Sequence, residues 1–538
     1  MRALRVGSLL VAALLLQSAV AAEPAKAPPP ARLVVAIMPP AGETAAAEEL
    51  GLMIQSRAAA LLAENGEYQE VCVKQILRMA EREGLTAASL ATRDAAALAA
   101  KRVGASRAAY GRLKADGPAW TLELSLTDAS GAALEQKLPA ENAKAVEVGA
   151  AALAKLVAGA DKVKLRENVP ALTASDEASK SYGACLAVLL KQPIGIENPS
   201  IIGEKELAAA AAACRKATSA DPKFAPAWSG LALALALQGE DAKAVEALAK
   251  VDPKSGYLPL YWLARYWLVT RYQSNEAGAA VLREAIARHP GYLLARGYLG
   301  EHLNAVASYE EALVVFKEYA ALCPKSPYAL TREGYALSHL KRYDEAIAIA
   351  RRALELEPTS RDLAVELGSR YIDAGQLDKA IETLKPVTAG AGATGEGLLR
   401  LGYAYLLKKD LASAEALFRK AEQTATRPAE WRTRGRAKFD FAKVLVLRGD
   451  AKTASEVVME AMREGFKPYS LWRADEDLVA IAKKVEADLD KEKVAKVNLD
   501  IRPALPRETS PFAVDAAGEI DPARQRPTPP PGFALIKF

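Results

Sequence analysis

Small residues recur in this chain at intervals of 34 residues, and this period constrains the fold more than any other feature. Glycine recurs at Gly300, Gly334, Gly368 and Gly402, alanine at Ala312, Ala346, Ala380 and Ala414, and proline at Pro290, Pro324 and Pro358. Two helices that cross closely leave room only for a small side chain at the crossing, and proline ends a helix because it cannot continue one. The period therefore predicts a solenoid of helix pairs over residues 175–485.

The register extends backwards to Pro222 and Ala244 but is degenerate in the copy that starts near Pro259. That copy has Tyr266 where glycine is expected and Gly278 in place of alanine. We therefore expect irregular stacking at this point of the array.

The pattern loosens beyond Pro428. We expect a last, longer pair over 431–447 and 451–464, and a capping helix over 471–485, which a solenoid needs at its end. Residues 486–538 form a charged helix end and then a tail that contains eight prolines between 499 and 538. We predict that this proline-rich tail is disordered or polyproline-like. Its last residues, Phe533–Phe538, are either a short docking peptide or a frayed end.

The first 22 residues have the pattern of a secretory signal peptide. Arg2 and Arg5 precede the apolar run Leu9–Leu16, and small residues follow as far as Ala22. We predict cleavage near Ala21, a linker over 23–31, and a periplasmic or secreted bacterial protein; an uncleaved anchor is the alternative. No other segment is apolar over the length of a membrane-spanning helix, so we expect no stable membrane insertion after cleavage.

Residues 32–165 alternate strand and helix signals and predict a small α/β domain. The run 33–38 is continuously apolar, as in a buried strand. In Trp120–Thr127, apolar and polar residues alternate with the period of two of a half-buried strand. Helices are expected over 93–103 and 144–157.

The repeat copies resemble the tetratricopeptide-repeat (TPR) family. Leu401 and Gly402 with Tyr405, Ala414 and Phe418 form one nearly complete copy. The resemblance implies a mainly α protein, an α-solenoid of TPR helix pairs, that binds protein or peptide partners in a concave groove.

The N-terminal domain resembles the N-terminal domain of TolB-like proteins. The resemblance lies in residues 34–39, 104–111 and 120–128, and Pro40 departs from the family pattern. It implies a second docking or sensing site rather than a catalytic one.

The TPR resemblance also implies which residues line the groove, namely those at repeat positions 2, 5, 9 and 12, with 6 and 13 at the edge. These positions give Trp267, Tyr298, Glu301, Asn304, Tyr328, Thr331, Arg332, Tyr335, His339, Arg400 and Tyr403. Aromatic and arginine side chains are the types that contribute most to binding at protein interfaces. Some of these tyrosines could instead pack between helices.

The four cysteines do not form a disulfide framework or a C-x-x-C motif. Cys185 and Cys214 are expected in the middle of two antiparallel helices, where they are either bonded to each other or two buried free thiols. The three histidines lack metal-ligand spacing, so we expect no metal and no cofactor.

The net charge and the absence of catalytic motifs in the sequence argue against nucleic-acid binding and against an enzyme. A net charge of +5 over 538 residues shows no basic footprint for nucleic acid, and no catalytic motif is present, so we predict no enzyme. The leading hypothesis is an exported scaffold for protein or peptide partners of the cell envelope. The alternative is a ligand-binding sensor for a cell-wall fragment or another small molecule.

Overall fold

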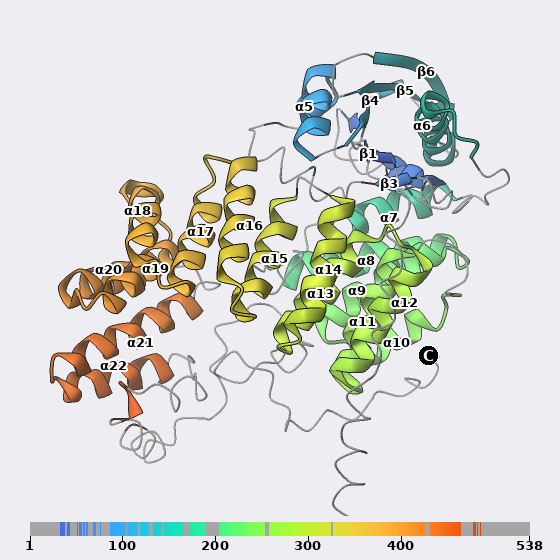
Figure 1. The fold of residues 1–538 in the computed structure, drawn as a ribbon. Helices are drawn as coiled ribbons and strands as arrows, with labels where there is room; N and C mark the ends of the chain where they lie inside the picture. Colours follow the sequence, from blue (N-terminus) through green and yellow to red (C-terminus); the bar gives the residue numbers. More distant parts are fainter. Residues whose placement is uncertain are drawn as a thin grey trace, which may run out of the picture.

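The structure is a computed structural model. It describes residues 33–37, 40–42, 68–70, 87–103, 105–116, 119–128, 133–141, 145–165, 175–189, 204–252, 258–323, 326–425 and 431–463, with single positions or short pieces within 51–62, at 76, 85 and 173, and within 477–485. A small α/β domain precedes a curved row of helix pairs (Figure 1). The predicted fold class, a mainly α solenoid behind a small α/β domain, is confirmed. The predicted signal peptide, linker and proline-rich tail lie outside the described residues.

The α/β domain contains one mixed sheet. Its strands are β1 (Leu33–Ile37), β2 (Ala41–Gly42), β3 (Tyr68–Glu70), β4 (Arg107–Asp116), β5 (Ala119–Asp128) and β6 (Ala133–Glu141). They lie in the order β3-β1-β4-β5-β6, with β2 paired to β4. β1 runs parallel to β3 and β4, whereas β4, β5 and β6 are successively antiparallel.

Helices cover both faces of this sheet. The short helix α4 (Ala87–Leu90) and α5 (Arg93–Val103) supply alanines and Leu90 to a core on one face. α6 (Ala145–Asp161) and helical residues within 51–62 pack on the other face, against Leu122, Leu124 and Leu126 of β5. These three leucines are at most 1% exposed. The structure therefore confirms that apolar residues of β5 face the core at every second position.

The solenoid consists of eight helix pairs within the described ranges. We call the first helix of each pair the A helix and the second the B helix. The A helices are α7 (Asp176–Leu189), α9 (Ala225–Gln238), α11 (Pro259–Tyr272), α13 (Leu293–Ala305), α15 (Pro327–His339), α17 (Arg361–Asp373), α19 (Gly395–Leu407) and α21 (Trp431–Leu447). The B helices are α8 (Glu204–Ala220), α10 (Asp241–Leu248), α12 (Asn275–Arg288), α14 (Tyr309–Leu322), α16 (Tyr343–Leu356), α18 (Leu377–Val387), α20 (Leu411–Thr424) and α22 (Ala451–Arg463).

The repeating glycines lie where A and B helices approach most closely. We number each repeat so that Gly300 takes position 8. A methyl group on Gly300 would come within 2.4 Å of the Phe316 ring, which lies at position 24 of the same repeat. A methyl group on Gly368 would come within 2.5 Å of Leu384, and one on Gly402 within 2.8 Å of Phe418. Gly334 is different because position 24 of its repeat is Ala350, and a methyl group there would meet nothing closer than 3.5 Å.

The degenerate repeat packs differently, as expected. Tyr266 at position 8 is fully buried, and its ring reaches the next A helix, 5.8 Å from Tyr298 and 5.9 Å from His302. Its hydroxyl lies 3.2 Å from Nδ1 of His302. The large side chain therefore connects two repeats. Glycine at the same position would only allow the A and B helices of one repeat to approach closely.

The first pair is joined by an unusually long connection. Two or three residues connect A to B in the other pairs, but residues 190–203 separate α7 from α8. The structure joins this pair by a disulfide between Cys185 and Cys214, whose Cα atoms are 5.5 Å apart. Both cysteines are fully buried and lie against Gly230 of α9.

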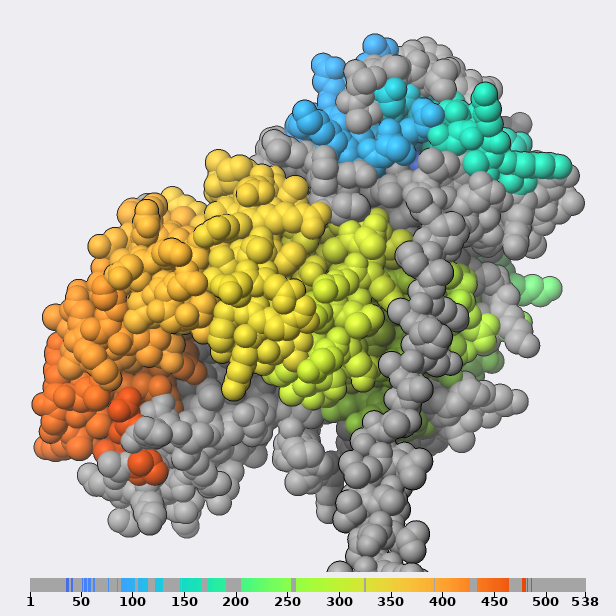
Figure 2. Space-filling model, in the orientation of Figure 1, coloured from blue at the N-terminus to red at the C-terminus, as the bar shows by residue number. Residues whose placement is uncertain are grey.

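The solenoid and the α/β domain share one hydrophobic cluster, which runs from β1 and α6 through α7 to α16. In the space-filling view the helix pairs form one continuous curved band (Figure 2). At the far end, Leu478, Ile481 and Val485 are buried against the last repeats. These three residues lie within the predicted capping helix, and most of the rest of that segment lies outside the described residues.

Candidate functional site: the face of the A helices

Successive A helices contact each other from α13 to α21 and so form a continuous layer. We call the surface made by their positions 2, 5, 6, 9, 12 and 13 the A-helix face. All eleven predicted groove residues belong to it, and the structure divides them into buried and exposed groups.

The predicted residues on α11 and α13 are buried. Trp267, Tyr298, Glu301 and Asn304 are between 4% and 9% exposed. Burial raises the pKa of Tyr298 above its usual range. In this structure these four side chains pack between helices, and their role in partner binding stays a prediction.

Glu301 is the centre of a polar cluster between α13 and α15. Its carboxylate accepts a hydrogen bond from the Tyr328 hydroxyl at 2.9 Å and lies 2.9 Å from Nε of Arg332. The Glu301 side chain is only 5% exposed and that of Arg332 only 13%. Burial, and then the Glu301 carboxylate, raise the pKa of Tyr328. Thr331 bonds instead to the Tyr328 carbonyl of its own helix. Arg332 therefore neutralises the buried carboxylate, and Tyr328 holds it by a hydrogen bond.

An aromatic cluster follows along α15. His339 is exposed and stacks on Tyr309 at 4.4 Å, with an interplanar angle of 8°, and Tyr335 lies 4.4 Å from it. From α17, the Arg370 guanidinium lies 5.7 Å from the centre of the Tyr335 ring. This cluster offers flat, partly exposed rings with a cation beside them.

The predicted residues on α19 are both at least partly accessible. The Arg400 side chain is 46% exposed and pairs with Glu396 of its own helix at 2.7 Å. Tyr403 is half-buried, and the Arg436 guanidinium of α21 lies 6.0 Å from its ring centre. Both residues are therefore presented to solvent on this part of the face.

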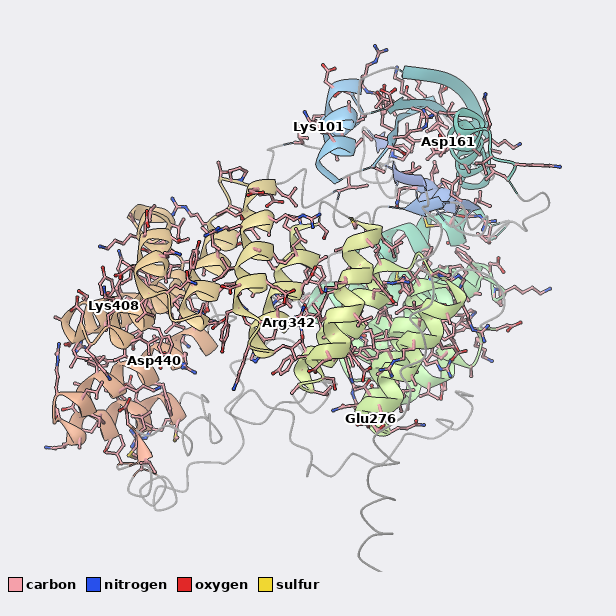
Figure 3. All side chains as sticks on the ribbon, viewed as in Figure 1. Lys101, Asp161, Glu276, Arg342, Lys408 and Asp440 are labelled. Atoms are coloured by element: carbon pink, nitrogen blue, oxygen red, sulfur yellow. A yellow bond between two sulfur atoms is a disulfide. The ribbon has the colours of Figure 1, made fainter. Side chains whose placement is uncertain are left out.

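Sequence reasoning missed the residues of α21. Ala454 occupies position 20 of the last repeat, which puts Arg436, Asp440 and Lys443 at positions 2, 6 and 9. Asp440, labelled in Figure 3, is 1% exposed and accepts a hydrogen bond from Arg436 at 2.9 Å. An alignment of the last repeat on its position-20 alanine, rather than on the prolines that end the B helices, would have identified these three residues.

Tyr266, His302 and Arg370 were also missed. Tyr266 and His302 are at position 8 of the degenerate repeat and position 10 of the next, and Arg370 is also at position 10. These positions are not among those taken to line the groove. The register marked Tyr266 as a departure from glycine but did not indicate that it contacts the next repeat, and it gave no signal for His302 and Arg370.

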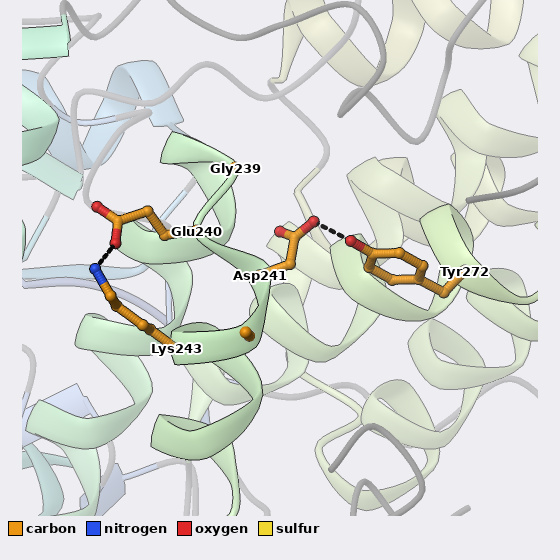
Figure 4. Close-up of a pocket in the computed structure, with 6 residues that line it drawn as sticks. Gly239, Glu240, Asp241, Lys243 and Tyr272 are labelled. Carbon is orange, nitrogen blue, oxygen red and sulfur yellow. Dashed lines mark hydrogen bonds and ion pairs between the residues drawn. The ribbon is translucent and has the colours of Figure 1, made fainter. Parts of the chain in front are cut away.

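A separate shallow pocket lies at the α9–α10 turn (Figure 4). It has a volume of about 300 Å³ and is lined by Gly239, Glu240, Asp241, Ala242, Lys243 and Tyr272. Its buried carboxylate, Asp241, is already bound by Arg271 and by the Tyr272 hydroxyl. Burial and that hydrogen bond raise the pKa of Tyr272 to about 12. Because its buried carboxylate is already bound within the protein, this pocket does not support the hypothesis of a small-molecule sensor.

Within the described ranges, no group of three or more His, Cys, Asp or Glu side chains is placed to hold a metal ion. In the same ranges, no helix has both the length and the apolar character to span a bilayer.

Comparison with known families agrees with this geometry. Models of the tetratricopeptide repeat match residues 299–361, 337–393 and 395–425. The chain therefore contains tetratricopeptide repeats, as the resemblance of its repeat copies implied. Proteins built from such repeats generally serve as scaffolds for protein or peptide partners.

Individual relatives resemble parts of the chain. The anaphase-promoting complex subunit CDC16 of Saccharomyces cerevisiae is 26% identical over 206 residues, which are 37% of this chain and 20% of that protein. The chain thus spans about a fifth of that relative's length. A tetratricopeptide repeat protein from Parabacteroides merdae is 17% identical, with a TM-score of 0.35, over 44% of this chain and 93% of its own. YrrB, described as a TPR protein with an unusual peptide-binding site, is 17% identical, with a TM-score of 0.26, over 38% and 99%.

The family matches concern residues 299–425. The resemblance of the N-terminal domain to TolB-like proteins is not supported by them and stays a prediction.

Proposed function

We propose that this protein is an exported scaffold that binds a partner protein or peptide on the A-helix face. The observation that carries the proposal is the series of aromatic and arginine side chains on α15, α19 and α21. Tyr335, His339, Arg400, Tyr403 and Arg436 are all exposed or half-buried. Their helices belong to one layer, in which α17 contacts both α15 and α19, and α19 contacts α21. Such side chains bury a large area with few rotatable bonds, which suits them to protein recognition.

Export is the second part of the proposal. It is supported by the signal-like pattern of residues 1–22 and by a buried disulfide, since disulfides persist in oxidising compartments such as the periplasm. The partner is then a protein or peptide of the cell envelope, with no part for nucleic acid or catalysis. The N-terminal α/β domain, with its TolB-like features, is proposed as a second docking site.

Position-specific photocrosslinking tests the binding face. A photoreactive amino acid is placed at His339 or Tyr403, and in control variants at Val314 of α14 or Lys420 of α20. Both control side chains are exposed and lie on B helices. We expect the same envelope protein to be captured from positions 339 and 403 and not from 314 and 420. Equal capture from all four positions, or capture only from the B helices, would refute the proposed face.

N-terminal sequencing of the protein from the envelope fraction tests export. We expect the chain to begin at Ala22 or Glu23. An intact Met1 in that fraction would contradict the cleavage.

A further inference from the structure

Two buried polar side chains on the A-helix face have no hydrogen-bond partner among the described residues. They are the amide of Asn304, at both its nitrogen and its oxygen, and the hydroxyl of Ser338. Each residue is only 7% exposed. Buried polar groups are nearly always hydrogen-bonded, so an unsatisfied pair calls for a reason.

Asn304 and Ser338 share position 12 in adjacent A helices, α13 and α15, which contact each other. The next three A helices have Ile372, Leu406 and Val446 at that position. Apolar residues are thus acceptable at position 12. Position 12 is polar in three successive A helices, as Thr270 of α11, Asn304 of α13 and Ser338 of α15, and apolar in the three that follow. The last two of these polar residues lie on the helices that border the aromatic cluster of Tyr335 and His339.

The surroundings indicate what kind of segment would complete the hydrogen bonds. Tyr309, Tyr335 and His339 present rings, and Asn304 and Ser338 supply donors. Grooves that combine aromatic walls with donors suit proline-rich segments in the polyproline II conformation. Such segments expose backbone carbonyls, carry few N–H groups and lose little entropy on docking.

The chain itself contains a segment of this chemistry. Residues 527–538 read Pro-Thr-Pro-Pro-Pro-Gly-Phe-Ala-Leu-Ile-Lys-Phe. Residues 486–526, 41 in number, link it to the end of the described solenoid at Val485. A linker of that length spans at most roughly 140 Å. Four repeats, from α21 back to α13, extend over only about 40 Å when helices pack about 10 Å apart.

We propose that residues 527–538 are an intramolecular ligand of the A-helix face around α13–α17. The proline stretch lies along the aromatic cluster, and its carbonyls accept hydrogen bonds from the Asn304 amide and the Ser338 hydroxyl. Side chains such as Tyr335 turn aside to admit it, as interface side chains commonly do on binding. The segment then competes with external partners for the same face, so this inference rests on the proposed function.

Fluorescence anisotropy with a labelled synthetic peptide of residues 527–538 tests whether this segment binds the A-helix face. The chain ending at residue 526 is expected to bind the peptide saturably. The full chain is expected to bind it at least ~10-fold more weakly, because its own segment is tethered at an effective concentration on the order of 1 mM. Equal affinity for the two chains, or no saturable binding by the shorter one, would overturn the proposal.

Two variants of the shorter chain locate the site. Asn304→Leu is expected to weaken peptide binding about 10-fold without lowering the melting temperature, because it removes a buried amide that has no partner. Val314→Asn, on the exposed side of α14, serves as the matched control and should leave the affinity unchanged. Equal effects of the two variants would place the peptide elsewhere.

Crosslinking in the full chain is a third test, and it does not need the shortened chain. A photoreactive residue in place of Phe533 should crosslink to peptides of α13–α17; crosslinks only to other elements, or none, would refute intramolecular docking. If these tests fail while positions 339 and 403 still capture an envelope protein, the further inference falls and the proposed function stands.

Discussion

The two halves of the A-helix face use the same repeat positions in different ways. On α11 and α13 the residues at positions 6, 9 and 12 are buried, and Tyr298 and Glu301 contact side chains of neighbouring helices. On α19 the equivalent side chains, Arg400 and Tyr403, are exposed or half-buried. The register of a repeat therefore fixes which way a side chain points, but not whether it remains accessible. Neighbouring repeats decide that.

The sharpest test of this difference compares two arginines at position 6. Arg332→Ala leaves the Glu301 carboxylate buried without its cation, which is expected to cost about 3–5 kcal/mol. Arg400→Ala breaks a solvent-exposed pair with Glu396 and should cost about 0–1 kcal/mol. Denaturant unfolding of both variants measures the two losses. Similar losses would mean that the two halves do not differ in this way.

The disulfide is expected to give the next largest effect. It closes a loop with a sequence separation of 29 residues in place of the short turn found in the other pairs. Replacing Cys185 and Cys214 by alanine should therefore lower stability by about 3–4 kcal/mol, by loop-closure entropy.

Thiol counting on the denatured, non-reduced chain is the check on the bond itself. The sequence has four cysteines. Four reactive thiols per chain would refute the disulfide, whereas two are expected.

A third pair of variants compares glycines at position 8. Gly300→Ala forces a methyl group against the Phe316 ring and should destabilise the protein by about 1–3 kcal/mol. Gly334→Ala meets no atom closer than 3.5 Å and should stabilise by up to about 1 kcal/mol, since alanine favours a helix over glycine. If the melting temperatures of both variants shifted in the same direction, the residue at position 24 would not decide whether a methyl group fits at position 8.

The smallest effect concerns the degenerate repeat. Tyr266→Phe keeps the buried ring but removes the hydroxyl that lies 3.2 Å from His302. We expect a loss of about 1 kcal/mol, typical of one buried hydrogen bond. In the same thermal-unfolding assay, Tyr266→Gly should lose several times more, because it restores the repeat consensus but empties the contact between repeats.

Much of the fold could be predicted from the sequence, because it depends on local periods. The 34-residue spacing located the helix pairs, and the alternation of Leu122, Leu124 and Leu126 located the buried face of β5. Both signals arise from steric requirements that recur within a few residues or at a fixed interval.

The state of the site could not be predicted to the same degree. Position 9 places Glu301 on the A-helix face. It gave no sign that Tyr328 and Arg332 of the next repeat would cover it, since that depends on how closely two repeats stack. Arg436 and Asp440 were missed because the longer α21 shifts the register of the last pair.

The long connection in the first repeat has a mechanical consequence. A chain pulled from its two ends would release its helix pairs one after another, each adding the full contour length of its residues. The 28 residues between Cys185 and Cys214 are held inside a covalent loop and cannot be drawn out. An oxidised chain would therefore extend roughly 100 Å less than a reduced one. The first repeat would therefore lengthen less under force than any of the repeats that follow it.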